Sequence, residues 1–176
     1  RDAVRSMMVT RLDSFLTADA KLRLPHSDTP DVSIILILYN QVEMTYSCLT
    51  AISECLSNSD VKIETIIFDN GSSDRTHAML DRIEGATIIR NDENLHFLRG
   101  VNAATGAAKG RHILLLNNDA QLMPGALEAA VKTLDEDATI GAVGARIILP
   151  DGKLQEAGSI IWSDGSCLGY GRGRSP

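Results

Sequence analysis

Asn117, Asn118 and Asp119 are the residues whose types and spacing best suit chemistry on a ligand. They follow directly on a run of four apolar residues, 113–116. Such a run is typical of a strand buried on both faces of a parallel sheet, and ligands of such sheets bind beyond the carboxyl ends of the strands. Asp119 offers the hard carboxylate oxygens that Mg²⁺ and Mn²⁺ prefer. The alternative is an ordinary Asn/Asp turn.

Two further apolar runs also end in polar residues. Tyr39 and Asn40 end the first, and Asp69, Asn70 and Gly71 follow the second. Parallel strands bring their carboxyl ends to one edge, so three polar ends together make a candidate site. Asp69 could accept hydrogen bonds from a base or a sugar, or it could stabilise the turn that follows it.

Strands and helices alternate along the chain. We expect strands at residues 32–39, 61–68, 86–90, 111–116, 140–149 and 154–162, and helices at 1–20, 42–56, 74–83, 97–109 and 124–134. This order predicts an α/β fold, a mostly parallel twisted sheet with helices on both faces.

Three regions divide the chain. Residues 1–30 are a one-faced helix and a linker with two prolines, residues 31–162 form the domain, and residues 163–176 are a loose glycine-rich tail. The apolar face of the first helix has no dense Lys/Arg face beside it, so we expect it to pack on protein rather than on a membrane. Whether it packs on this domain or on another one is left open.

Composition limits the classes of partner. The 176 residues carry a net charge of −6 and are 44% hydrophobic and 23% charged, as in an ordinary globular domain. The sequence has no basic cluster, which disfavours a nucleic acid as partner, and its apolar runs are too short to cross a bilayer. Cys48 and Cys55 lie seven apart on a predicted helix, about 10 Å along its axis, which is too far for a disulfide. Cys167 stands alone, so we expect free thiols.

The familiar phosphate-binding motifs are absent. The chain has no G-x-G-x-x-G after its first strand, which disfavours a dinucleotide-dependent dehydrogenase, and no G-x-x-x-x-G-K-[ST]. A sugar nucleotidylyltransferase would need a glycine-rich loop with Arg and Lys after that strand, where this chain has Tyr-Asn-Gln-Val. Phosphates bound here would need a cation.

Four segments in order resemble the motifs of one family. Residues 32–40, 69–76, 94–110 and 114–119 are similar to those of the family 2 glycosyltransferases, which have the GT-A fold. The resemblance extends from residue 31 to about residue 158. Its last part, 150–158, is similar to bacterial members that build surface polysaccharides, rhamnosyltransferase-like ones included.

The resemblance implies a donor site and a reaction. It places Tyr39 and Asn40 beside the base and ribose, Asp69 on the base edge, Asn102 and Asn118 along the donor pocket, and Asp119 on a Mg²⁺ or Mn²⁺ ion at the diphosphate. It implies a UDP- or dTDP-linked sugar donor, a glycan or lipid-linked acceptor, and a single inverting displacement in which a carboxylate deprotonates the acceptor.

Departures from the family pattern are local. Ile37 and Leu38 replace the usual Pro-Thr, Asn117 replaces the first acid of D-x-D, and His96 stands where glycine is common. Asp119 would then be the one carboxylate on the metal. His96 is either an exposed loop histidine or a titratable ring near the donor phosphates.

The catalytic base has no counterpart in this sequence. We expect it beyond Pro176, so that the chain, which begins with Arg1 rather than Met, is a donor-binding segment of a longer cytoplasmic enzyme that is inactive alone. Peripheral association with the inner membrane face through missing parts stays open. The alternative is a non-catalytic nucleotide-binding or assembly module of the same fold.

Overall fold

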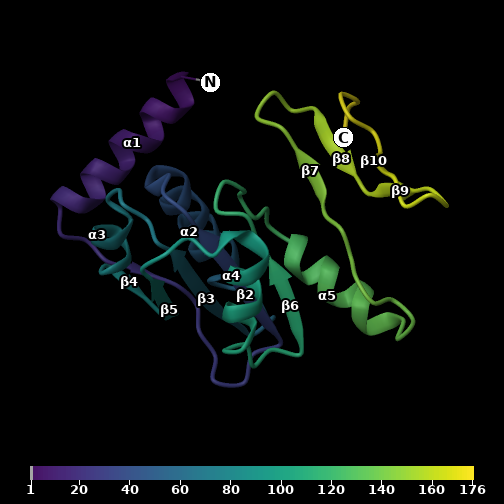
Figure 1. Ribbon diagram of the computed structural model, residues 1–176, viewed down its shortest axis with the longest axis horizontal. Helices are drawn as coiled ribbons and strands as arrows, with labels where there is room; N and C mark the ends of the chain where they lie inside the picture. The colour runs from purple at the N-terminus through teal and green to yellow at the C-terminus, as the bar shows by residue number, and fades with distance from the viewer. Residues whose placement is uncertain (1) are drawn as a thin grey trace. The chain divides into compact units, whose positions relative to one another are not determined.

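The computed structural model describes residues 2–176, so Arg1, the first residue of the expected N-terminal helix, lies outside the described residues. The chain forms two compact units, Arg1–Gly125 and Ala126–Pro176 (Figure 1). The first contains the helices α1 (Asp2–Thr17), α2 (Val42–Leu56), α3 (Thr76–Leu80) and α4 (His96–Thr105), and the strands β1 (Leu22–Arg23), β2 (Val32–Leu38), β3 (Ile63–Asn70), β4 (Ile83–Glu84), β5 (Ala86–Asn91) and β6 (His112–Leu115). The second contains α5 (Ala126–Glu136), β7 (Arg146–Ile148), β8 (Leu154–Ala157), β9 (Ser159–Ile161) and β10 (Cys167–Gly169).

A four-stranded parallel sheet forms the centre of the first unit, in the order β5-β3-β2-β6. The chain runs outward from β2 through β3 to β5 and then returns to the other side of β2 to form β6. The strand order therefore reverses between β2 and β6, and in open parallel sheets this reversal opens a crevice at the carboxyl ends of the strands. The expected parallel-centred α/β fold is confirmed.

The handedness of the connections places helices on both faces of this sheet. The connections β2-α2-β3 and β5-α4-β6 run in opposite directions, and because both are expected to be right-handed, α2 and α4 cover opposite faces. Ile35, Ile66 and Phe68 pack with Ala104 of α4. Alternate residues of β2, such as Leu36, are equally buried on the other face.

The N-terminal helix packs on α2 within the first unit. The rings of Phe15 and Tyr46 stack at 4.6 Å between centroids, and Arg5 forms an ion pair of 2.8 Å with Glu43. The expected linker does more than connect, because Leu24 is buried and follows a short parallel pair between β1 and β4.

Two expectations in the first unit were wrong. Ile83 does not extend α3 but lies in β4, since the chain leaves the helix after Leu80 to pair with β1. The strand before Asn117 is not buried on both faces. β6 is an edge strand of its sheet, and Ile113 and Leu115 remain about half exposed.

The second unit is more broken than expected. The strand expected at 140–149 is limited to β7, and the strand expected at 154–162 is divided into β8 and β9 by Gly158, whose φ of +96° interrupts an extended strand. The tail expected to be loose contains β10, which pairs antiparallel with β9. Among residues 2–176, no helix has both the length and the apolar character to cross a bilayer.

Gly110 tests how closely the segment between α4 and β6 approaches β2. A Cβ at Gly110 would overlap the backbone nitrogen of Ser33 and lie 2.7 Å from the carbonyl carbon of Val32. We expect Gly110→Ala to lower the free energy of unfolding by about 2 kcal/mol or more, because backbone must shift. At Gly106 a Cβ meets only the carbonyl oxygen of Ala103 at 3.5 Å, so Gly106→Ala should change stability by less than about 0.5 kcal/mol. Equal effects of the two variants in chemical denaturation would contradict the close approach.

Candidate functional site

An open cleft of about 320 Å³ lies at the carboxyl edge of the parallel sheet. Its walls come from the ends of β2 and β3, from the segment that leads from β5 into α4, and from the segment after β6. The cleft is lined by Ile37, Tyr39, Gln41, Asn70, Asn94, His96, Phe97 and Asn118. Polar ends of three strands therefore meet at one edge, as the alternation of strands and helices predicted.

Side-chain alternation at the end of β3 sends Asp69 and Asn70 to opposite faces of the sheet. Asn70 lies on the same face as Phe68, which packs with α4, and it lines the cleft. Asp69 lies on the face of α2 and α3, is fully buried, and does not line the cleft. Successive residues of a strand always separate in this way, so this end of β3 serves two environments.

Asn70 fixes the segment that leads into α4. Its Oδ1 accepts the Leu95 amide at 2.7 Å, and its Nδ2 donates to Asn94 Oδ1 at 2.9 Å. Asn94 Oδ1 in turn accepts the amide of His96 at 2.8 Å. At Gly71, with φ of +79°, an added Cβ would lie only 3.1–3.3 Å from the backbone of residues 92–94. This wall of the cleft is thus held by a buried amide.

Asp69 holds the turn that follows β3 and contacts α3. Its Oδ1 accepts the Ser72 amide at 3.1 Å, and its Oδ2 lies 2.8 Å from Nε2 of His77. That close approach falls outside hydrogen-bond geometry, and Oδ2 accepts no hydrogen bond from the described residues. The carboxylate that the resemblance assigns to the base edge is therefore engaged within the protein.

Tyr39 and Asn40 have different environments. Tyr39 lines the cleft and is 51% exposed. Asn40 has a φ of 57°, a left-handed conformation that asparagine tolerates better than most residues. Its Oδ1 accepts the amides of Ser73 at 2.8 Å and Asp74 at 3.3 Å. The Asn40 side chain thus orders the loop after β3 and is absent from the cleft wall.

Helix α2 holds the segment after β6 by its side chains. Thr45 Oγ1 accepts from Asn118 Nδ2 at 3.0 Å, and the Cys48 thiol donates to the carbonyl of Asn117 at 3.7 Å. Further along, Gln121 Nε2 donates to Ser47 Oγ at 2.7 Å. These contacts fix the backbone on both sides of Asp119.

Asp119 is exposed and lies close enough to Cys48 to act on it electrostatically. Burial raises the pKa of the Cys48 thiol to about 12, and the negative charge of Asp119 adds to the rise. Among the described residues, no group of three or more His, Cys, Asp or Glu side chains could hold a metal ion. A cation at Asp119 would therefore take its other ligands from phosphate and water, as Mg²⁺ commonly does.

Asn102 is exposed on α4 and does not line the cleft. Conversely, Gln41, Asn94 and Phe97 line the cleft although they were not predicted as site residues. The polar segment before α4 was the available signal for Asn94 and Phe97. It follows the carboxyl end of β5, so it lies at the edge of the sheet where ligands of parallel sheets bind.

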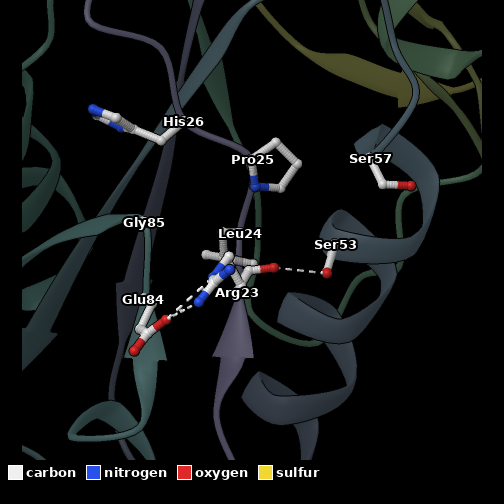
Figure 2. Close-up of a pocket in the computed structure, with 8 residues that line it drawn as sticks. All are labelled: Arg23, Leu24, Pro25, His26, Ser53, Ser57, Glu84 and Gly85. Carbon is white, nitrogen blue, oxygen red and sulfur yellow. Dashed lines mark hydrogen bonds and ion pairs between the residues drawn. The ribbon is translucent and has the colours of Figure 1, made fainter.

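A second and larger cavity, of about 510 Å³, lies between β1, β4 and the last turns of α2 (Figure 2). The guanidinium of Arg23 pairs with Glu84 at 3.0 Å, and the carbonyl of Arg23 accepts from Ser53 at 2.9 Å. The charged groups Arg23 and Glu84 in the lining of this cavity thus pair with each other. It also lies away from the strand ends that carry the candidate residues, so we assign the site to the smaller cleft.

Comparison with known sequences defines the class of protein. Residues 33–166 match the family model described as glycosyl transferase family 2. The chain belongs to this family. It is 31% identical to the chondroitin synthase of Pasteurella multocida over 71% of this chain and 13% of that protein. It is 30% identical to the succinoglycan biosynthesis protein ExoO of Rhizobium meliloti over 67% of this chain and 32% of that protein.

Solved structures support the fold. The mannosyltransferase PcManGT of Pyrobaculum calidifontis, solved with GDP-Man and Mn²⁺, superposes with a TM-score of 0.57 at 20% identity, covering 85% of this chain and 48% of that one. TarS 1-349 of S. aureus gives a TM-score of 0.51 at 20% identity, covering 60% of this chain and 32% of that one. The GT-A fold is thereby confirmed. The chain spans less than half the length of each of these relatives.

The hydrogen bonds of Asn70 with Leu95 and Asn94, here called the Asn70 clamp, predict a local change in dynamics when Asn70 is replaced. Asn70→Ala removes the acceptor of the Leu95 amide and the donor to Asn94. We expect a loss of about 1–3 kcal/mol in stability, because buried polar groups lose their partners, and faster hydrogen exchange at Leu95. Asn102→Ala, at an exposed position of α4, should leave both unchanged. Unaltered exchange at Leu95 in Asn70→Ala would contradict the clamp.

The raised pKa of Cys48 predicts both low reactivity and a pH dependence. Because the folded state favours the neutral thiol, Cys48 contributes its full stabilisation below the unfolded-state pKa of about 8.5. This contribution to the free energy of unfolding is lost as pH rises toward the folded-state pKa of about 12. At pH 8 we expect a thiol reagent to label the exposed Cys167 rapidly and Cys48 only on unfolding. Cys167→Ser should remove the fast phase. Cys48→Ser should flatten the alkaline stability curve, and rapid labelling of Cys48 in folded protein would contradict the burial argument.

Proposed function

We propose that residues 31–162 form the nucleotide-sugar-binding part of a glycosyltransferase, and that the cleft beside β2 receives a UDP- or dTDP-linked sugar. The observation that carries this proposal is the convergence of Tyr39, Asn70 and Asn118, from three strand ends, on one cleft at the point where the strand order reverses. Membership of the family supports it. The reversal point is where open parallel sheets bind nucleotides.

The nucleoside would bind between aromatic and amide groups. Tyr39 and Phe97 line the cleft and expose 51% and 56% of their surfaces, so ring faces are available for a base. Asn118 and Gln41 offer donors and acceptors to the sugar and phosphate. Asp69 would reach the base edge only by giving up its contact with His77. We assign Asn40 to ordering the loop after β3, and Asn102 to the donor side beyond the cleft wall.

A divalent cation is consistent with the donor set. Asp119 presents one exposed carboxylate, and α2 holds residues on both sides of it, Asn117 and Asn118 before it and Gln121 after it. Mg²⁺ or Mn²⁺ bound there would neutralise the charge that develops on the departing diphosphate. With one protein carboxylate, binding should be weak until a diphosphate supplies further oxygens.

The reaction we propose is a single displacement with inversion. The acceptor hydroxyl oxygen of a glycan or lipid-linked acceptor forms a bond to the anomeric carbon, the bond to the diphosphate oxygen breaks, and a carboxylate takes the hydroxyl proton. None of the described residues that line the cleft is a carboxylate. We therefore place the base beyond Pro176, so that this chain alone binds donor without transferring it.

A non-catalytic nucleotide-binding or assembly module is the second candidate. The absence of a carboxylate among the described residues that line the cleft favours it, as does Asn117 in place of a second acid beside Asp119. Sugar transfer, or hydrolysis of the donor, by a longer protein containing this chain would exclude it. Donor binding without either reaction in that protein would favour it.

Ligand-dependent stability tests the proposed donor site. We expect UDP or dTDP with Mn²⁺ to raise the Tm by several degrees at concentrations about 100 times Kd, because a ligand that binds only the folded state adds about 2.7 kcal/mol. Asp119→Ala should abolish the Mn²⁺-dependent part of the rise.

The matched control is Asp28→Ala, which removes an exposed carboxylate from the segment before β2 and should leave the rise intact. No shift with either nucleotide in the wild-type chain would count against the proposal. A full Mn²⁺ response in Asp119→Ala would remove Asp119 as the metal ligand.

A further inference from the structure

His96 combines two properties in the cleft wall. It lines the cleft and is exposed, and its φ is +60°. A left-handed conformation is strained for a residue with a Cβ, and glycine would carry no such cost. Residues kept in such conformations are concentrated at binding sites. This position therefore bears a conformational cost for a side chain that faces the cleft.

Neighbouring side chains fix the backbone of His96 in this conformation. Its amide donates to Asn94 Oδ1 at 2.8 Å, and its carbonyl accepts from Asn70 Nδ2 at 3.4 Å. Asn70 is 2% exposed and also accepts the amide of Leu95 at 2.7 Å. The backbone at residue 96 is thus held by a buried group, so the imidazole projects from a fixed point on the wall.

The charges around the cleft make this imidazole distinctive. Of the eight described residues that line the cleft, His96 and Tyr39 are ionisable, and a phenol is neutral near pH 7. The end of β3 faces the cleft with Asn70, because Asp69 lies buried on the other face beside His77.

The segment after β6 faces the cleft with the amide of Asn118, and the exposed Asp119 follows it. Asp92, Glu93 and Arg99, on the segment of His96 itself, are exposed and are not part of the lining. A protonated His96 would thus supply positive charge within the wall of a protein whose net charge is −6.

We propose that His96 contacts the phosphate groups of the ligand in this cleft and strengthens their binding when its ring is protonated. The inference deepens the proposed function, because it assigns a second, metal-independent contact to the diphosphate. Asn118 lines the same cleft as His96 and directly precedes Asp119. A diphosphate near Asp119 would therefore lie beside the cleft whose wall carries the imidazole.

Metal-free binding isolates this contact. UDP, dTDP and inorganic pyrophosphate are titrated by calorimetry in EDTA at pH 5.5 and pH 8. At pH 5.5 we expect the wild-type chain to bind about 10-fold more tightly than His96→Gly, the effect of one charge-assisted hydrogen bond. At pH 8 the two should agree within about twofold. Comparing variants at the same pH removes the titration of the phosphates themselves.

Variant stability separates binding from folding. Because glycine relieves the strained φ, His96→Gly should have a Tm equal to or above that of the wild type while it binds more weakly. His96→Asn keeps a side chain that tolerates this backbone, and its affinity relative to His96→Gly should be the same at pH 5.5 as at pH 8. His26→Asn, at the histidine that pairs with Asp28 beside the other cavity, should keep the full pH dependence.

Three results separate the role of His96 from the proposed donor site. In NMR titrations, pyrophosphate should raise the pKa of the His96 ring and leave that of His26 unchanged. Binding of nucleotide or pyrophosphate that is the same in wild type and His96→Gly at both pH values overturns the role of His96 and leaves the donor site intact. If neither nucleotide binds, with or without Mn²⁺, the proposed function is overturned. If pyrophosphate does not bind either, the role of His96 is overturned as well.

Discussion

The reversal of strand order between β2 and β6 is the constraint on which the candidate site depends. Because the chain passes from β5 back across the sheet before forming β6, two strands that are far apart in sequence become neighbours, with Val32 in register with His112. The polar segments that follow them then face each other without a connecting loop between them. The apolar residues of β2, buried on both faces, provide a rigid floor for that edge.

Hydrogen bonding within the site divides its side chains into two sets. Asn40, Asp69 and Asn70 bind other parts of the protein through their side chains. Tyr39, Phe97, His96 and Asp119 remain exposed. The first set fixes loops whose entropy would otherwise oppose ligand binding, and the second set is available to a ligand. Motif likeness alone does not distinguish these sets, since both consist of residues in the same motifs.

The sequence predicted the sheet well because its signals are local. The apolar runs of β2 and β3 predict buried parallel strands, and both were confirmed. The exposure of Ile113 was missed because edge position is decided by strand order, which no local pattern records. β4 and β10 were missed because two or three residues carry too little periodicity, and pairing with β1 and β9 decides their structure.

The limits on predicting the site have the same origin. The convergence of strand ends followed from the fold class, but the direction of each side chain did not. One residue of register at the end of β3 decides that Asn70 faces the cleft and Asp69 faces α3. The contacts of α2 with residues 117–121 join positions about 70 apart in the chain, which sequence spacing cannot reveal. The family motifs thus identify which segments meet at the cleft, whereas packing of these segments decides which of their side chains face it.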